Sequence, residues 1–438
     1  MSQTALITLL AILLYTGGLF GGPRSGKIET APPGAHSISE QKGVVRASTV
    51  AVHDAPRSRN IIANLVRGDE VTILGEAGGW YEVRLPNGQT GFVNTFAVTT
   101  ATTSIPAARP GRYDVFAYYV TDLRRPSMPS LRENVDVITA VVPWMWQVTP
   151  DGDLLADFSS GEVAQALAFA GSRGAGSYAL VHNLRQTASG AITFDAALAS
   201  ELLANPASRA RAAEAILRRL EEWSMSGVHI DFEQVLPRDR QNLNLFLKTL
   251  AERLRPAGFS VTIAVPAKVS DSAASSWSGG YDYATIARYV DKMVLMTYDE
   301  HWRGGEPGPV ASIGWVEKVV RYALSVGVPP EKIILGIPAY GYDWPRRGQG
   351  RAVTYAEAME LAGRHGVRIE WDDEAKVPHF TYGDGRKVYF ENRASIAHKI
   401  GLVKKYGLAG VSLWRLGQED PGIWTVIRSE LASGQSAG

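Results

Sequence analysis

The chain has 438 residues, enough for two or three domains, and its 45% hydrophobic content allows a large buried core. The net charge is +1 without a basic block, which excludes the usual electrostatic footprint of a nucleic-acid-binding protein. Cysteine is absent, which excludes disulfides, cysteine-based zinc sites, thiol nucleophiles and an acylated lipoprotein cysteine.

The chain opens with an apolar segment. Residues 4–20 read TALITLLAILLYTGGLF and carry no charge. The run is long for the core of a signal peptide and at the lower limit for a membrane span. No basic residue precedes it, whereas Arg24 and Lys27 follow. We therefore expect residues 1–22 to be a signal peptide or an N-terminal membrane anchor. The protein is then exported: secreted, periplasmic or associated with the cell envelope.

A linker rich in Gly, Pro and Ser follows at residues 23–43, and residues 44–98 then read as short alternating strands separated by turns. Asn87-Gly88 is a strong hairpin signal. The pieces VRAS, GDEVTIL and WYEVRLPNGQTGFV resemble, in this order, the bacterial SH3-like domain. The resemblance implies a small all-β barrel that binds cell-wall peptide or glycan, with a ligand-free spacer as the alternative. A second linker rich in Thr, Ala and Pro covers residues 99–111.

Residues 112–432 alternate apolar, strand-like runs with helical patterns. The eight predicted strands are 114–120, 136–142, 177–182, 228–232, 260–265, 293–298, 333–337 and 409–414. Before the fifth strand, Leu243, Phe246, Leu247, Leu250 and Leu254 recur at helical spacing, with Asp239 as a candidate cap and Gly258 as a stop.

This order of elements favours an α/β fold, the (β/α)₈ or TIM barrel. The competing open doubly wound sheet usually has a Gly-rich phosphate turn after an early strand, and the sequence shows none. The stretch at about 343–390 is too long for one helix and contains the turn Asp384-Gly385, so we expect a small insertion there.

The fourth predicted strand, GVHIDFE at residues 227–233, carries an unusual polar face. Because side chains alternate along a strand, His229, Asp231 and Glu233 point to one face. Ionisable groups facing a barrel interior are costly unless they are paired or functional. An edge strand in water is the alternative, which the flanking core helices disfavour. Asp231 and Glu233 are too close along one strand to flank a sugar ring from opposite faces. A nucleophile supplied by the substrate therefore fits better than a mechanism in which one of the two carboxylates is the nucleophile.

Four segments together resemble glycoside hydrolase family 18. SGVHIDFE (226–233) is similar to the family motif DGxDxDxE. LMTYDEHW (295–302), LGIPAYGYDW (335–344) and GLAGVSLWRLG (407–417) are similar to the segments of the sixth, seventh and eighth strands. The similarity spans about residues 112–430. It is closest to the branch that contains spore-germination and cell-wall N-acetylglucosaminidases.

The resemblance implies roles for individual residues. Glu233 matches the general acid and base, Asp231 the carboxylate that orients the substrate's 2-acetamido group, and Tyr298 the hydroxyl that bonds the acetamido carbonyl. The acetamido oxygen then forms an oxazolinium, with retention of configuration. Trp414 matches the floor of the −1 subsite, and Asp299 would line it. No cofactor or metal is implied. Further candidate substrate-binding residues near strand ends are Tyr118, Trp144, Trp146, Asn183, Tyr340, Tyr342 and Trp344.

Two positions depart from the family motif. Ser226 replaces its first Asp, and His229 replaces its middle Asp, where the closer branch usually has Asn. As a neighbour behind the catalytic pair, His229 could hydrogen-bond Asp231, and a protonated His229 would favour the ionised form of Asp231. We therefore expect His229→Asn to change the pH profile.

The leading hypothesis is a β-N-acetylglucosaminidase acting on β-1,4 bonds in peptidoglycan or in chitin-like glycans. Export and the SH3-like module favour peptidoglycan, an argument by analogy because one fold serves several substrates. The alternatives are a catalytically silent glycan-binding protein of the cell wall and an SH3-led interaction protein with a scaffold barrel.

Overall fold

The computed structural model describes residues 41–45, 49–56, 58, 60–66, 68–77, 80–100, 113–186, 192–272 and 274–431. The predicted leader or anchor at residues 1–22 lies outside these residues, as do most of the predicted linkers at 23–43 and 99–111. Within the described part of the chain, no helix is both long and apolar enough to cross a membrane.

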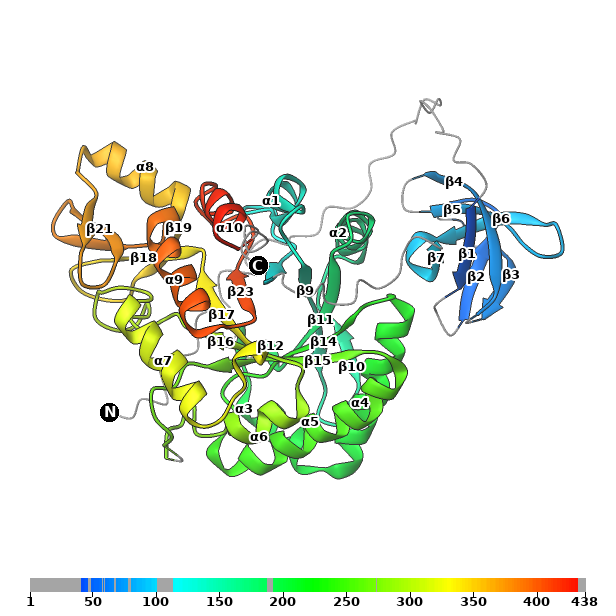
Figure 1. The fold of residues 1–438 in the computed structure, drawn as a ribbon, viewed down its shortest axis with the longest axis horizontal. Helices are drawn as coiled ribbons and strands as arrows, with labels where there is room; N and C mark the ends of the chain where they lie inside the picture. Colours follow the sequence, from blue (N-terminus) through cyan, green and yellow to red (C-terminus); the bar gives the residue numbers. More distant parts are fainter. Residues whose placement is uncertain are drawn as a thin grey trace, which may run out of the picture.

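The first unit is an antiparallel sheet of seven strands, drawn in blue in Figure 1. Its strands are β1 (Gln41–Val45), β2 (Thr49–His53), β3 (Ile61–Val66), β4 (Glu70–Ala77), β5 (Trp80–Arg84), β6 (Thr90–Asn94) and β7 (Val98–Thr100). They pair in the order β3-β2-β6-β5-β4-β1-β7. Gly88 has a φ of 85° in the β5–β6 hairpin, a backbone conformation that favours glycine. The predicted small all-β unit is confirmed.

The second unit is a closed barrel of eight parallel strands (Figure 1). The strands are β8 (Asp114–Tyr119), β9 (Ala140–Val148), β11 (Gly176–His182), β14 (Gly227–Asp231), β15 (Ser260–Pro266), β16 (Lys292–Met296), β17 (Ile333–Pro338) and β23 (Gly410–Trp414). The pairing of β23 with β8, and of β8 with β9, closes the ring. The predicted (β/α)₈ barrel is confirmed.

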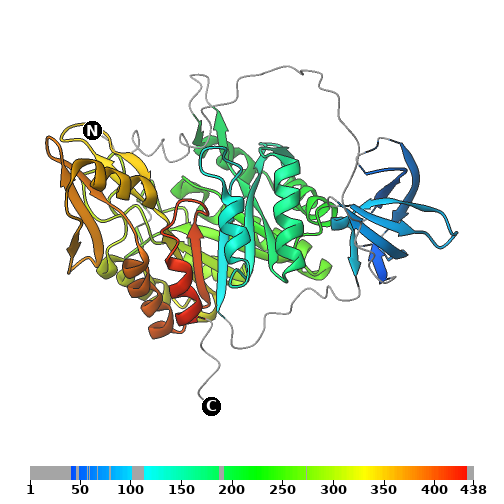
Figure 2. The same ribbon diagram turned by 90° about the horizontal axis from the view of Figure 1, so that it is seen from above.

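Helices surround the barrel in both views (Figures 1 and 2). They are α1 (Ser127–Asn134), α2 (Ser160–Ser172), α3 (Ala196–Ala204), α4 (Pro206–Glu222), α5 (Arg240–Leu254), α6 (Tyr283–Tyr289), α7 (Ile313–Ser325), α9 (Arg393–Tyr406) and α10 (Ile423–Leu431). The apolar stripe predicted for α5 is buried. Asp239 stands at its N-cap position without a side-chain cap bond, and Gly258 ends the short turn after it with a φ of 86°.

The second barrel strand lies farther along the chain than predicted, at 140–148 instead of 136–142. Asp136 and Val137 belong to the turn after α1, where the Val137 N–H donates to the Asn134 carbonyl at 3.2 Å. The strand continues through Pro143 and then pairs with β10 (Leu154–Ala156). A strand buried on both faces reads as a continuous apolar run, so its ends are not marked by alternation.

The stretch after the seventh strand forms a five-stranded antiparallel sheet with one helix, drawn in yellow and orange beside the barrel in Figures 1 and 2. Its elements are β18 (Tyr340–Trp344), β19 (Arg351–Thr354), α8 (Tyr355–His365), β20 (Glu370–Asp372), β21 (Val377–Tyr382) and β22 (Arg386–Tyr389). Buried Asp343 ties it together by accepting hydrogen bonds from Tyr382, Arg386 and Arg351 at 2.9, 3.0 and 3.1 Å.

Candidate active site

The polar face of β14 points into the barrel, as the alternation predicts. His229 and Asp231 are 0% and 5% exposed, and Glu233 is half-buried directly after the strand. The intervening side chains pack in the outer layer between strand and helices, where Phe232 stacks on Phe246 at 5.5 Å. The structure therefore places two carboxyl groups together at the carboxyl end of the barrel, where enzymes of this fold carry out catalysis.

Burial shapes the protonation of this carboxyl pair. It raises the pKa of Asp231 to about 7. Burial, together with the negative charges of Asp231 and Asp299, raises the pKa of Glu233 well above its usual range. Two carboxylates in one desolvated site resist being ionised together. The pair therefore keeps a proton to a higher pH than an isolated carboxyl group would.

Asn183, directly after β11, holds the backbone of Glu233. The Glu233 N–H donates to Asn183 Oδ1 at 2.9 Å, and Asn183 Nδ2 donates to the carbonyls of Glu233 and Asp195 at 2.9 and 3.0 Å. Asn183 is 0% exposed, and these three bonds use its amide oxygen and both amide hydrogens. The Asn183 side chain therefore holds the backbone at Glu233, and its predicted contact with substrate stays a prediction.

His229 makes two hydrogen bonds, and neither reaches Asp231. Thr262 donates its hydroxyl proton to the Val228 carbonyl at 3.0 Å, so its oxygen accepts from His229 Nδ1–H at 2.9 Å. Nε2 is then the acceptor for the Tyr118 hydroxyl at 2.8 Å. Burial lowers the pKa of His229 to about 3, so the ring is neutral. The expected pairing of a protonated His229 with Asp231 is wrong, because both ring nitrogens are already bonded.

Tyr298 and Asp299 follow β16 after one intervening residue, Thr297. Asp299 has a φ of 61°, and its Oδ1 accepts hydrogen bonds from Tyr340 and Tyr342 at 2.7 and 2.9 Å. Burial raises its pKa to about 6. Burial also raises the pKa of half-buried Tyr298 well above the usual range, so its hydroxyl remains a donor at neutral pH. The structure thus brings Tyr298, Asp299 and Tyr340 to the Glu233 end of the barrel.

Three aromatic side chains form a continuous floor at this end. Trp414 closes β23 and is half-buried; its ring centroid lies 5.1 Å from Tyr118 and 5.9 Å from Trp144. We call these three residues the aromatic floor. Tyr118 and Trp144 are buried beneath the partly exposed Trp414, so Trp414 is the member whose face is available to the apolar face of a sugar ring.

Trp146 and Trp344 do not belong to this group. Trp146 is 2% exposed and packs in the outer layer against Phe158 and Trp223 at 5.8 and 6.2 Å. Trp344 is 1% exposed and packs against Tyr342 inside the inserted unit. The predicted cleft position of Trp146 is therefore wrong, because its side chain lies in the outer core. Trp344 clusters with Tyr340 and Tyr342 beside Tyr298 and Trp414, and its predicted contact with substrate stays a prediction.

Several residues that contact the site side chains are not predicted from the sequence. Thr262 lies opposite His229 in the β14–β15 ladder, a register that emerges only once the strands are paired. His182 stacks on Trp144 at 4.4 Å, and its Nε2 lies 3.6 Å from Asp157 Oδ2. Trp144 Nε1 donates to the same oxygen at 3.5 Å. Among the described residues, no group of three or more His, Asp or Glu is arranged to hold a metal ion.

Comparison with known families decides the assignment. The family model for glycosyl hydrolases family 18 matches residues 194–419, more than half of the chain. The chain belongs to glycosyl hydrolase family 18. It is therefore a glycosidase. A second family model, for the bacterial SH3 domain, matches residues 48–97 within the first unit.

Individual relatives agree with this family 18 assignment. An uncharacterized glycosylase of Bacillus subtilis, YvbX, is 35% identical over 54% of this chain and 70% of its own. The cortical fragment-lytic enzyme of Bacillus anthracis is 34% identical over 53% of this chain and 56% of its own. The crystal structure of a chitinase from Chromobacterium violaceum superposes with a TM-score of 0.68 at 30% identity, covering 73% of this chain and 99% of that one.

Proposed function

We propose that this family 18 enzyme is a retaining β-N-acetylglucosaminidase that cleaves β-1,4 bonds next to N-acetylglucosamine in peptidoglycan or chitin-like glycans. The observation that carries the proposal is the pair of buried Asp231 and half-buried Glu233 at the end of β14, with the pKa of both carboxyl groups raised. A carboxylic acid that keeps its proton near neutral pH is what protonation of a glycosidic oxygen requires.

In the first step, protonated Glu233 transfers its proton to the glycosidic oxygen. The bond from this oxygen to the anomeric carbon breaks, and the substrate's acetamido oxygen bonds to that carbon to form an oxazolinium. Asp231 orients the acetamido group and stabilises the positive charge that develops on it. The Tyr298 hydroxyl, kept protonated by its raised pKa, donates to the acetamido oxygen.

In the second step, the Glu233 carboxylate accepts a proton from water while the water oxygen bonds to the anomeric carbon. The oxazolinium ring opens and restores the acetamido group. Two inversions at one carbon give net retention. Trp414, at the centre of the aromatic floor, supports the sugar ring throughout, and Asp299 lines the same subsite.

The choice of glycan rests on the rest of the chain and on its relatives. One relative is named as an enzyme that lyses cortical fragments, and a structural neighbour is a chitinase. The SH3 domain would bind the cell wall, and the apolar segment at residues 4–20 would export the protein or anchor it in the envelope. This combination favours peptidoglycan over chitin.

Product analysis tests the proposal. Wild-type protein and Glu233→Gln are incubated with purified peptidoglycan and with chitooligosaccharides, and the products are identified by mass spectrometry. We expect new reducing ends at N-acetylglucosamine with wild type, and a loss of about 10²–10⁴-fold with the variant.

Two outcomes would overturn the proposal. Absence of reducing ends from both substrates with wild-type protein would mean that the glycosidase has another substrate. Cleavage of a substrate analogue without the 2-acetamido group at the wild-type rate would rule out the oxazolinium route, since that group supplies the nucleophile.

A further inference from the structure

Two loops meet behind the catalytic acid. One follows β14 and carries Glu233, and the other joins β15 to α6. Their approach is close: a Cβ added to Gly280 would lie 2.3 Å from the Val235 carbonyl oxygen. Only glycine leaves room for this contact between the two backbones. The loop after β15 can therefore act directly on the backbone around Glu233.

The residue of this loop that bonds to the backbone beside Glu233 is Tyr281, whose side chain is 0% exposed. Its hydroxyl donates to the Phe232 carbonyl at 2.6 Å. That carbonyl belongs to the peptide bond whose N–H is that of Glu233, and this N–H donates to Asn183 at 2.9 Å. Both polar groups of the peptide bond between Phe232 and Glu233 are thus hydrogen-bonded. Tyr281, after β15, bonds the carbonyl, and Asn183, after β11, bonds the N–H. Gln234, the next residue, has a φ of 57°, so the chain leaves Glu233 in a left-handed conformation.

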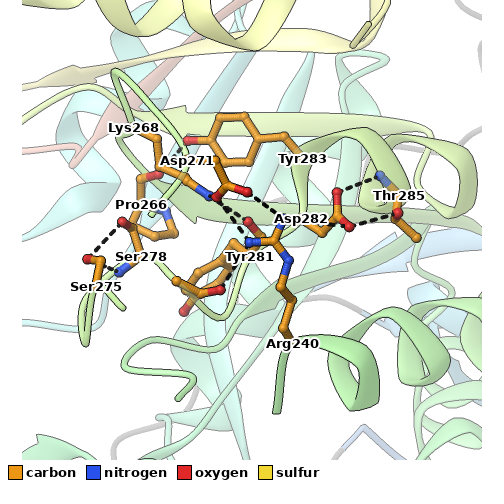
Figure 3. A network of polar contacts seen from close by, with 11 residues as sticks. Arg240, Pro266, Lys268, Asp271, Ser275, Ser278, Tyr281, Asp282, Tyr283 and Thr285 are labelled. Carbon is orange, nitrogen blue, oxygen red and sulfur yellow. Dashed lines mark hydrogen bonds and ion pairs between the residues drawn. The ribbon is translucent and has the colours of Figure 1, made fainter. Parts of the chain in front are cut away.

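Tyr281 is fixed in turn by a buried cation. Lys268 is 3% exposed, donates to the Tyr281 carbonyl at 2.8 Å and pairs with Asp271 (Figure 3). Asp271 also accepts two hydrogen bonds from Arg240 at 2.9 and 3.0 Å, and Arg240 donates to the Gly279 carbonyl at 3.2 Å. The network therefore spans the loop from its start at Lys268 to Tyr281.

We propose that Tyr281 is a positioning residue for the catalytic acid, and that Lys268 holds Tyr281 in place for this task. Tyr281 and Asn183 together form a two-sided clamp: Tyr281 bonds the carbonyl, and Asn183 the N–H, of the peptide before Glu233. The inference rests on the proposed function of Glu233. Loss of the Tyr281 hydroxyl leaves the Phe232 carbonyl without its donor, so the peptide can rotate and displace the Glu233 carboxyl. A displacement of about 1 Å at a reacting group costs on the order of 10²-fold in rate.

Tyr283 provides a matched control within the same network. It is 2% exposed, and its hydroxyl also donates to a backbone carbonyl, that of Pro266 at the end of β15. This carbonyl is not part of the Glu233 loop. Tyr281→Phe and Tyr283→Phe thus each remove one buried hydroxyl, but only the first removes a contact to the peptide before the acid.

The experiment compares wild type, Tyr281→Phe and Tyr283→Phe, after thermal unfolding has shown that each is folded. For glycan hydrolysis we expect Tyr281→Phe to lower kcat about 10- to 100-fold while KM changes less than about twofold. Tyr283→Phe should stay within about twofold of wild type in both parameters. Equal losses in both variants, or none in Tyr281→Phe, would overturn the proposal.

A readout independent of turnover separates this proposal from the proposed function. With ¹³C-labelled glutamate carboxyls, NMR titration follows Glu233 directly, its signal being assigned with Glu233→Gln. We expect Tyr281→Phe to shift this titration and Tyr283→Phe to leave it unchanged. A shift in protein that hydrolyses no glycan would support the clamp and reject the substrate. If Tyr281→Phe does not fold, Lys268→Met replaces it, and an unchanged Glu233 titration in that variant would overturn the clamp.

Discussion

The Tyr118 hydroxyl lies 2.8 Å from Nε2 of His229 and donates a hydrogen bond to it. Since Thr262 accepts from Nδ1–H on the other side, His229 is a neutral bridge between the strands β8, β14 and β15. Where the family motif has a carboxylate next to Asp231, this enzyme therefore has an uncharged ring. Burial instead raises the pKa of both Asp231 and Glu233, and the charges of Asp231 and Asp299 raise the pKa of Glu233 further.

His229 makes folding stability depend on pH. Its pKa is lowered from 6.5 to about 3 by burial, so between these values the unfolded chain binds the extra proton. The contribution of His229 is fully present above about pH 6.5 and is lost as the pH falls toward 3, at about 1.4 kcal/mol per unit. In urea unfolding, the difference between wild type and His229→Asn should shrink from pH 7 to pH 4.5. Equal differences at both pH values would contradict this prediction.

The negative charge of Asp299 contributes to the raised pKa of Glu233. Asp299→Asn should therefore lower that pKa. In the proposed mechanism, activity needs protonated Glu233 and is lost as the pH rises through the pKa of this residue. The alkaline limb of the kcat/KM profile should therefore move to lower pH in Asp299→Asn. Asp157→Asn is the control, because the Asp157 charge is not among the causes of the Glu233 shift. An identical displacement in both variants would refute the assignment.

Asn183 should matter for turnover more than for binding. Asn183→Ala removes the acceptor of the Glu233 N–H and the donor to its carbonyl, so the carboxyl loses its fixed position. We expect kcat to fall on the order of 10²-fold with a nearly unchanged KM. Asn244→Ala, at an equally buried asparagine on α5, should leave kcat near the wild-type value. A rise in KM with unchanged kcat would instead make Asn183 a substrate-binding residue.

A buried ion pair stabilises the last part of the barrel. Lys399 on α9 donates to both carboxylate oxygens of Glu391 at 3.0 and 2.8 Å, and both side chains are 1% exposed. Lys399→Met leaves a buried carboxyl unpaired and should lower the free energy of unfolding by about 3–5 kcal/mol. The double variant with Glu391→Gln should recover much of this loss. Urea unfolding of the single and double variants measures both, and equal losses would argue against an unpaired charge as the cause.

Several features of the site were predictable because they depend on local pattern. The alternation along GVHIDFE places His229, Asp231 and Glu233 on one face whatever surrounds the strand. The second strand was misplaced because a run that is apolar on both faces has no period from which its start can be located. For the same reason, the sequence pattern does not show that Trp146, a candidate cleft residue, points to the outer layer.

The amino-acid sequence by itself determined the number of barrel strands, the family and the carboxyl pair, since these follow from apolar periodicity and short motifs. Only the tertiary structure decided that His229 bonds Tyr118 and Thr262, and that Asn183 and Tyr281 hold the backbone of Glu233. These contacts join residues 33 to 111 positions apart. Such distant partners are chosen by barrel closure and by the register between strands, and neither is encoded in the pattern of any one segment.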